Sequence, residues 1–139
     1  MLNSFTIGNV AKQINLPVKT VRYYADLGLL SPHLSRDNNG YRLFSPAVFQ
    51  RLNFIRRSQS LGLTLKEIKQ ILVVYDQQQI PCSVAKQLLT DKLEEIESKI
   101  NELKMLKDEL NGILSSWQEI KNFENVKDNI CPNIANINH

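Results

Sequence analysis

Apolar side chains near the start of the chain recur at the three- and four-residue spacing of a helix. They follow Thr6, a good N-cap, and end at a break over residues 15–17; the set is Ile7, Val10, Ala11 and Ile14. Pro17 suits the opening turn of a second helix, over about residues 18–27, which Gly28 ends. We expect Val18, Val21 and Ala25 on its inner side, and Lys19, Arg22, Tyr23 and Asp26 on its outer side.

A hairpin and two further helices follow in the pattern. Asn39-Gly40 is typical of a two-residue hairpin turn, and residues 41–44 read as a short strand, so the pair forms a wing. Ser45-Pro46 predicts the start of a third helix whose apolar side holds Val48, Leu52, Phe54 and Ile55. Thr64 and Glu67 form a capping box for a fourth helix. We expect Arg51, Arg56 and Arg57 on or near the exposed side of this helix pair.

A long helix is predicted from about residue 81 to residue 117, because a seven-residue apolar repeat continues through it. One core position of the repeat holds Leu89, Ile96, Leu103, Leu110 and Trp117, and the other holds Lys86, Leu93, Ile100, Lys107 and Leu114. A lone helix cannot bury this stripe. The two lysines disfavour a strict parallel zipper, so we expect an antiparallel pair of helices in which the lysine stems reach outward. Residues 121–139 are expected to form a loop with at most a short helix after Cys131-Pro132.

The charge is divided unevenly between the two halves of the chain. Its 139 residues contain 17 Lys and Arg and 14 Asp and Glu. Residues 1–70 hold ten basic and three acidic side chains, a balance of +7, and the remainder holds seven basic and eleven acidic ones, a balance of −4. This asymmetry indicates a polyanion-binding half joined to a separate assembly module.

The chain shows neither a signal-peptide pattern nor an apolar run long enough for a membrane span, so we expect a cytoplasmic protein with no membrane partner. Cys82 and Cys131 lie 49 positions apart. In a reducing compartment they are expected to be free thiols or ligands rather than a disulfide.

Two short helices with a break between them and a polar outer face favour a helix-turn-helix that reads DNA. Arginine can donate two hydrogen bonds to guanine, whereas Lys and Tyr suit phosphates. From the spacing alone, a small helical bundle with a solvated charged face remains an alternative.

Five motifs in succession make the chain resemble the MerR family of transcription regulators. They are Thr6 to Ala11, Thr20 to Tyr24, Gly28 to Pro32, Asn39 to Phe44 and Leu61 to Ile68. The resemblance covers residues 5 to about 75, and the long helix extends it to about 119. It implies a mainly α fold with a winged helix-turn-helix DNA-binding domain at 1–75, a linker and antiparallel dimerisation helix at 76–119, and a C-terminal effector-binding loop at 120–139.

The resemblance also implies a homodimer that binds a near-palindromic operator in double-stranded promoter DNA. Effector binding would distort that DNA so that RNA polymerase can engage both promoter elements. Carried over by position, the DNA contacts are expected from the recognition helix, the wing and a second wing: Lys19, Thr20, Arg22, Tyr23, Tyr41, Arg42 and Arg56.

The two cysteines resemble metal ligands of the sensors in this family. Cys82 begins the long helix, and Cys131-Pro132-Asn133-Ile134 is similar to the end of their metal-binding loop. In the sensors that the chain resembles, a Cys at the head of this helix accompanies sensing of divalent ions, so the resemblance implies a divalent ion (Hg, Zn, Pb or Cd), with Cu(I) as an alternative. The middle cysteine of the family pattern is missing here. Two thiolates suffice for linear Hg(II) or Cu(I), whereas tetrahedral Zn(II) would need further donors such as Glu124, Asp128, His139 or water.

Other functions compete with metal sensing. A thiol or redox-responsive regulator and a ligand-free architectural DNA-binding protein both fit the same fold. His33 is expected at the surface or facing DNA rather than as a ligand. An enzyme is disfavoured because the sequence has no phosphate loop and no paired nucleophile and base. A drug sensor is disfavoured because fewer than thirty residues follow the long helix.

Overall fold

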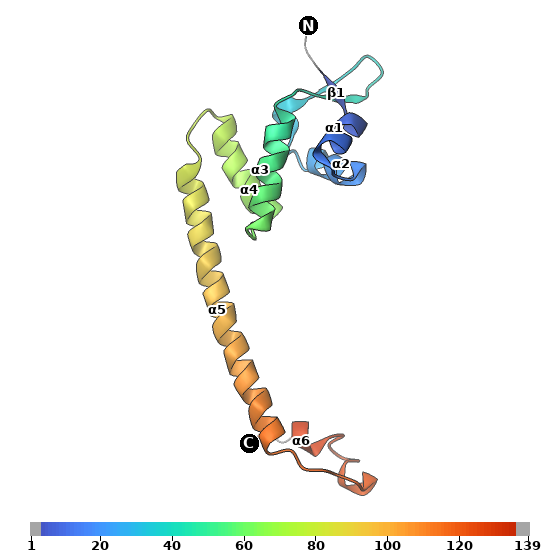
Figure 1. Ribbon diagram of the computed structural model, residues 1–139, viewed down its shortest axis with the longest axis vertical. Coiled ribbons are helices and arrows are strands. Elements are labelled where there is room, and N and C mark those ends of the chain that lie inside the picture. The colour runs from blue at the N-terminus through green and yellow to red at the C-terminus, as the bar shows by residue number, and fades with distance from the viewer. Residues whose placement is uncertain (1–3, 136–139) are drawn as a thin grey trace. The chain divides into compact units, whose positions relative to one another are not determined.

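A computed structural model of the protein describes residues 4–135 and is mainly helical with one small sheet, as the sequence predicts (Figure 1). The chain divides into two compact units, Met1–Lys92 and Leu93–His139. The first unit contains, in order, β1 (Phe5–Thr6), α1 (Ile7–Ile14), α2 (Val18–Asp26), the 3-10 helix η1 (Ser31–His33), β2 (Leu34–Arg36), β3 (Arg42–Phe44), α3 (Val48–Ser60), α4 (Leu65–Asp76) and the start of α5 (Cys82–Ser115). The second contains the rest of α5, the 3-10 helix η2 (Phe123–Asn125) and α6 (Pro132–Ala135).

Capping boxes start α1 and α4 where the sequence predicts helix starts. The Asn9 backbone N–H donates to the Thr6 hydroxyl oxygen at 3.2 Å, and the Glu67 N–H donates to Thr64 at 3.1 Å. The Thr64 N–H in turn donates to the Glu67 carboxylate at 2.9 Å. This backbone hydrogen bond holds the pKa of Glu67 below its usual value, and the Lys92 ammonium 3.3 Å away adds to the effect. Side-chain caps therefore fix both helix entries.

The wing differs from its predicted form in the length of its turn. β2 and β3 pair antiparallel with Arg36 opposite Arg42, and the Asp37 N–H donates to the Tyr41 carbonyl at 2.9 Å. Residues 38–40 therefore form a three-residue loop, not the predicted two-residue turn. Gly40 alone in that loop has a positive φ, 82°, because a type I turn followed by a left-handed glycine needs only one such residue. Tyr41 precedes the strand instead of starting it.

Two further boundaries depart from prediction. A third strand, β1, pairs with β3 and sets Phe5 opposite Phe44, which the local pattern did not reveal. The third helix begins at Val48 rather than at Pro46. Pro46 and Ala47 form a turn before it, closed by the hydrogen bond from the Val48 N–H to the Ser45 carbonyl at 3.0 Å. The chain therefore turns sharply between the sheet and α3.

The core of the first unit gathers side chains from α1 to α4, from β3 and from the turn that follows α2. Its most deeply buried members are Val10, Val21, Leu29, Leu30, Phe44, Val48, Leu52, Ile55 and Ile68. Val18, predicted on the inner side of α2, is instead 36% exposed, and Tyr24 is buried in its place. Phe54, predicted on the apolar side of α3, is 38% exposed. Rotation of each helix about its axis, set by its neighbours, decides these positions.

Arg51 is buried, contrary to its predicted place on the exposed side of α3 and α4. Only 5% of its surface is exposed, and its guanidinium donates to the two Asp76 carboxylate oxygens at 2.7 and 2.8 Å. A third hydrogen bond runs from the Arg51 Nε–H to the Leu29 carbonyl. Arg51 lies three residues after Val48 and four before Ile55, within the buried stripe of α3. It can occupy this place because its charge is paired there.

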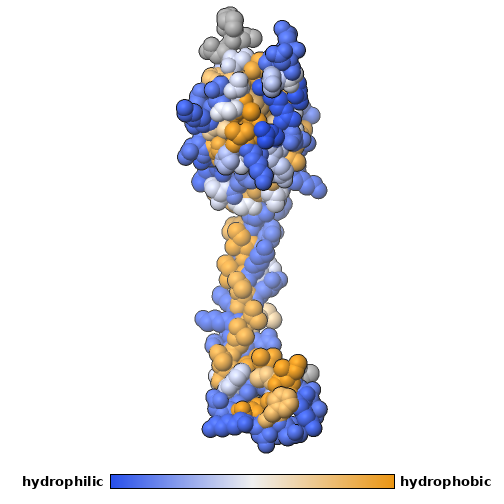
Figure 2. Space-filling model, turned by 90° about the vertical axis from the view of Figure 1, so that its right-hand side faces the viewer, coloured by the Kyte–Doolittle hydropathy of each residue, from blue (hydrophilic) through white to orange (hydrophobic). Residues whose placement is uncertain are grey.

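The helix α5 carries its apolar repeat on an unburied face. None of its residues is buried, and the repeat residues remain 41–65% exposed, including Leu89, Leu93, Ile96, Ile100, Leu103, Leu110 and Leu114. Figure 2 shows apolar side chains gathered along one side of this helix. Trp117, the last predicted member, follows the helix end at Ser115. None of the helices formed by residues 4–135 is long and apolar enough to cross a membrane.

We predict that Asp76→Ala lowers the free energy of unfolding by about 2 kcal/mol, because it leaves the buried Arg51 guanidinium without its counter-charge. Urea denaturation at a fixed protein concentration measures the change. Asp91→Ala, which removes an exposed carboxylate, is the control and should change stability by less than about 0.5 kcal/mol. Equal stability of the two variants would contradict the role assigned to the Arg51 pair.

Candidate DNA interface and thiol positions

The outer face of α2 presents three of the four residues expected on the recognition helix. Lys19, Arg22 and Tyr23 are exposed, whereas Thr20 is half-buried. Within its two turns α2 therefore offers two cations and one phenol toward solvent. A helix of this length fits the major groove, where such donors can reach base edges and phosphates.

The opposite face of α2 holds the helix in place. Val21 and Ala25 are buried, and the Tyr24 hydroxyl donates to the Gln59 amide oxygen on α3 at 2.8 Å. Burial raises the pKa of Tyr24, with the nearby Arg56 charge and the Gln59 hydrogen bond opposing that rise. Of the adjacent tyrosines, Tyr23 faces outward and Tyr24 anchors α2 to α3.

An ion pair connects the wing to α2. The Arg42 guanidinium lies 2.6 Å from the Asp26 carboxylate, and the Arg42 side chain is 23% exposed. Arg36 donates to the Gly40 carbonyl at 2.8 Å and so braces the loop. Tyr41, at the base of that loop, is 69% exposed. The wing is therefore fixed relative to α2 and presents Tyr41.

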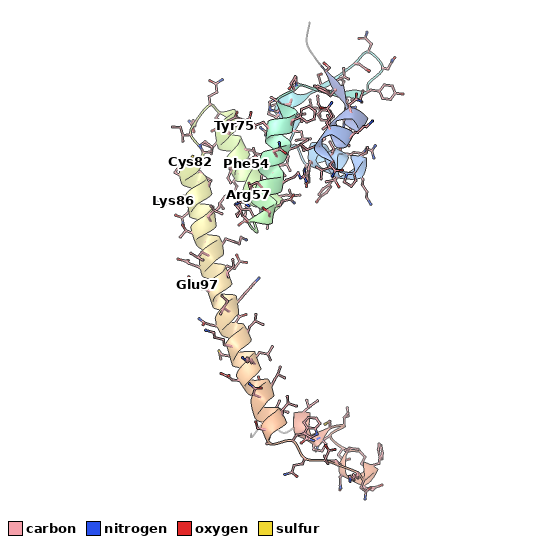
Figure 3. The ribbon with its side chains drawn as sticks, in the orientation of Figure 1. Phe54, Arg57, Tyr75, Cys82, Lys86 and Glu97 are labelled. Atoms are coloured by element: carbon pink, nitrogen blue, oxygen red, sulfur yellow. The ribbon has the colours of Figure 1, made fainter. Side chains whose placement is uncertain are left out.

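Arg56, expected as the DNA contact of the second wing, also has a partner within the protein. It donates to the Ile14 carbonyl at 2.7 Å and thereby satisfies an end group of α1. A guanidinium has five N–H donors, so this bond leaves others for a phosphate. The neighbouring Arg57 is exposed (Figure 3). Its guanidinium donates to the Ser60 hydroxyl.

The two thiols lie in different units, and both are free. Cys82 is the exposed first residue of α5 (Figure 3). Cys131 is half-buried, and its carbonyl accepts the Ile134 and Ala135 N–H groups at 3.1 and 2.9 Å, which starts α6.

Asn133 fixes the loop that carries Cys131. Asn133 is buried, with 8% of the residue's surface exposed. Its side-chain amide accepts the Gln118 N–H at 2.9 Å and donates to the Gln118 carbonyl at 2.8 Å. These two bonds close residues 118–133 into a loop beyond the end of α5. Ile130, just before Cys131, has a φ of 67°, a conformation that β-branched residues rarely adopt. Cys131 is therefore presented by a constrained loop.

Within residues 4–135, no group of three or more His, Cys, Asp or Glu side chains is placed to hold a metal ion. Of the extra donors suggested by the sequence, Glu124 lies 3.0 Å from the Lys127 ammonium, and His139 lies outside the described residues.

His33 is half-buried rather than at the surface. Its Nδ1 lies 3.2 Å from the Ser45 hydroxyl, and it lines a cavity of about 130 Å³ with Phe54, Tyr75 and Pro81. Burial lowers the pKa of His33, and the positive charge of Arg51 lowers it further. This environment favours a neutral imidazole within the fold.

The sequence does not predict the roles of two residues that shape these sites, Asp26 and Asn133. The seven-residue spacing from Lys19 to Asp26 predicts that the two share the outer face of α2, but not that Asp26 pairs with the wing. The motif around Cys131 contains Asn133 without predicting its hydrogen bonds. No local signal indicates pairings across 16 or 15 positions, because the intervening turns decide them.

Models of two protein families match the chain. One, described as "MerR HTH family regulatory protein", covers residues 5–73, and the other, "MerR, DNA binding", covers residues 49–113. The mercuric resistance operon regulatory protein of Bacillus cereus is 39% identical over 102 residues, which span 73% of this chain and 76% of that protein. The regulator ZntR of Escherichia coli is 32% identical over 103 residues, 73% of this chain and 72% of its own.

Solved structures show the same fold. The transcription regulator PbrR691 of Ralstonia metallidurans, in complex with lead(II), has a TM-score of 0.75 at 32% identity and covers 86% of this chain and 93% of its own. HiNmlR, a regulator bound to promoter DNA, has a TM-score of 0.55 at 24% identity and covers 97% of both chains, which indicates a shared fold.

We predict that Asn133→Ala raises the reactivity of Cys131 toward a thiol reagent by about tenfold, because loss of the Gln118 hydrogen bonds frees the loop to open. The rates for the two cysteines are measured separately under native conditions. The rate at Cys82 serves as an internal reference, and Asn125→Ala, at an exposed position of the same unit, is the matched variant. An unchanged rate at Cys131 would show that Asn133 does not constrain it.

Proposed function

The chain belongs to the MerR family of helix-turn-helix regulatory proteins, and from this premise we propose that it is a metal-responsive transcription regulator that binds promoter DNA as a homodimer. Its relatives are transcription regulators, not enzymes. The observation that carries the proposal is the pairing of an exposed basic face on α2 with a wing fixed to it by Arg42 and Asp26.

DNA reading follows from the chemistry of that surface. Arg22 donates to guanine in the major groove, and Lys19, Thr20 and Tyr23 bind backbone or neighbouring base edges. Tyr41 and Arg42 contact the backbone from the wing, with Arg42 held in position by Asp26. Arg56 reaches a phosphate with the donors that Ile14 leaves unused.

In the proposed homodimer, the exposed apolar face of α5 is the surface that the second copy covers. Burying the repeat against a second copy removes it from water, which a single chain cannot do. Antiparallel packing lets Lys86 and Lys107 extend their ammonium groups to the surface while their stems cover apolar neighbours. The operator of such a dimer is near-palindromic, since a two-fold axis relates its half-sites.

The effector we propose is a soft or borderline metal ion held by Cys82 of one subunit and Cys131 of the other. Thiolates suit such ions, and two of them satisfy linear Hg(II) or Cu(I). Zn(II), Pb(II) or Cd(II) would recruit further donors. The names of the relatives support metal as the class of effector, since one belongs to a mercuric resistance operon and one structure holds lead(II).

Activation proceeds by a change in DNA shape. Without metal the dimer holds its operator in a repressing geometry. Metal bound to Cys82 and Cys131 fixes the C-terminal loop against the dimer helix and α4, which biases the two DNA-binding units toward a rotated arrangement. RNA polymerase then engages both promoter elements. The exposure and constraint of the thiols also fit a second candidate, a regulator that responds to thiol oxidation.

We predict that Arg22→Ala weakens operator binding by about 1–3 kcal/mol, because it removes a bidentate contact to guanine. Binding is measured on an operator selected from random DNA and on a scrambled duplex at the same salt concentration. The same substitution should weaken binding to the scrambled duplex much less. Unchanged operator affinity would remove Arg22 from the reading surface.

We predict that Cys82→Ser and Cys131→Ser each abolish metal-induced transcription while operator affinity stays nearly constant. Anaerobic titration of the reduced dimer with Hg(II), Zn(II), Pb(II) and Cu(I) should show one tightly bound ion that protects both thiols. Ser83→Ala, beside Cys82, is the control and should retain induction. Loss of DNA binding in the cysteine variants would make the thiols structural, and protection by none of the ions would favour thiol oxidation or a ligand-free regulator.

A further inference from the structure

Val18 is an exposed apolar residue at the start of the helix that reads DNA. It is the first residue of α2 and is 36% exposed. Val21 and Ala25, which the helical spacing places on the same side as Val18, are buried. Val18 is not one of the buried residues of the core. Packing within the described residues 4–135 leaves 36% of its surface open to solvent, where it can contact a ligand.

The position of Val18 places it on the reading surface. Residues four apart form a ridge along a helix, and Val18 lies on the ridge that continues through Arg22 to Asp26. Arg22 is exposed and Asp26 binds the wing residue Arg42. The N-terminal end of a recognition helix is the end that approaches base edges. Val18 thus leads the same surface that carries Arg22.

The stability of α2 does not favour a valine as its first residue. The first turn of α2 has no acidic residue, and Pro17 at the N-cap position makes no side-chain cap. A polar or acidic side chain near this helix start would interact favourably with the free N–H groups. Valine is β-branched and stiff about χ1, so it offers instead a rigid pair of methyl groups at a defined place.

We propose that Val18 selects a thymine in each operator half-site by contact with its 5-methyl group. Thymine alone presents an apolar group in the major groove, and removal of both apolar surfaces from water stabilises the contact. One helical turn separates Val18 from Arg22, a rise of about 6 Å. The selected thymine therefore lies within about two base pairs of the guanine bound by Arg22, given a rise of about 3.4 Å per base pair. This inference rests on the proposed DNA binding.

The test uses full-length protein and an operator selected from random-sequence DNA. Each thymine is replaced in turn by deoxyuridine, which lacks only the 5-methyl group. One thymine in each half-site should show about a fourfold loss of affinity on this replacement, the effect of one buried methyl group. Val18→Ala should bind the two forms of that site equally, and selection with Val18→Ser should lose the thymine preference there.

Val73→Ala is the matched control, because Val73 is an exposed valine on α4 and its replacement should leave the deoxyuridine effect intact. Thermal unfolding of Val18→Ala should match the parent, which excludes misfolding. Equal losses for the parent and Val18→Ala at every thymine, or no loss at any, would overturn the inference while specific binding stands. Failure to select any specific DNA would overturn the proposed function and the inference with it.

Discussion

The buried guanidinium of Arg51 connects three parts of the first unit. It binds the carbonyl of Leu29, just after the recognition helix, and the carboxylate of Asp76, the last residue of α4. A buried charge without these partners would be unstable, so the residues that satisfy it must keep their positions. Arg51 therefore helps to hold the helix-turn-helix in place relative to the end of α4, which leads into α5, together with the core packing and the Lys69 hydrogen bond to the Leu27 carbonyl.

On our proposal, the short helix α2 serves both the packing of the first unit and the reading of DNA. Val21, Tyr24 and Ala25 anchor one face, and the Tyr24 hydrogen bond to Gln59 resists rotation of the helix about its axis. On the other face, Lys19 and Arg22 are exposed, and the Asp26 carboxylate forms an ion pair with the wing residue Arg42. Rigid placement matters because hydrogen bonds to base edges depend strongly on direction.

The apolar repeat of α5 is exposed, and residues 4–135 contain no group of three or more His, Cys, Asp or Glu side chains placed to hold a metal ion. On our proposal, a second copy of the chain covers the repeat and supplies the second thiolate through the same antiparallel pairing. On our proposal, burial of the repeat and capture of the effector are therefore coupled, and the loop held by Asn133 keeps Cys131 ready for that role.

Local sequence determined that the helices and the wing form, and it determined the caps of α1 and α4 at Thr6 and Thr64, because caps, glycines and apolar spacing act over a few residues. The succession of motifs also determined the family. Only the tertiary structure decided that Arg51 is buried, that Val18 faces outward and that Asp26 and Asn133 bind distant partners. These features depend on how each helix is rotated against its neighbours and on contacts between residues far apart in the chain, where the free energy of packing outweighs the local pattern.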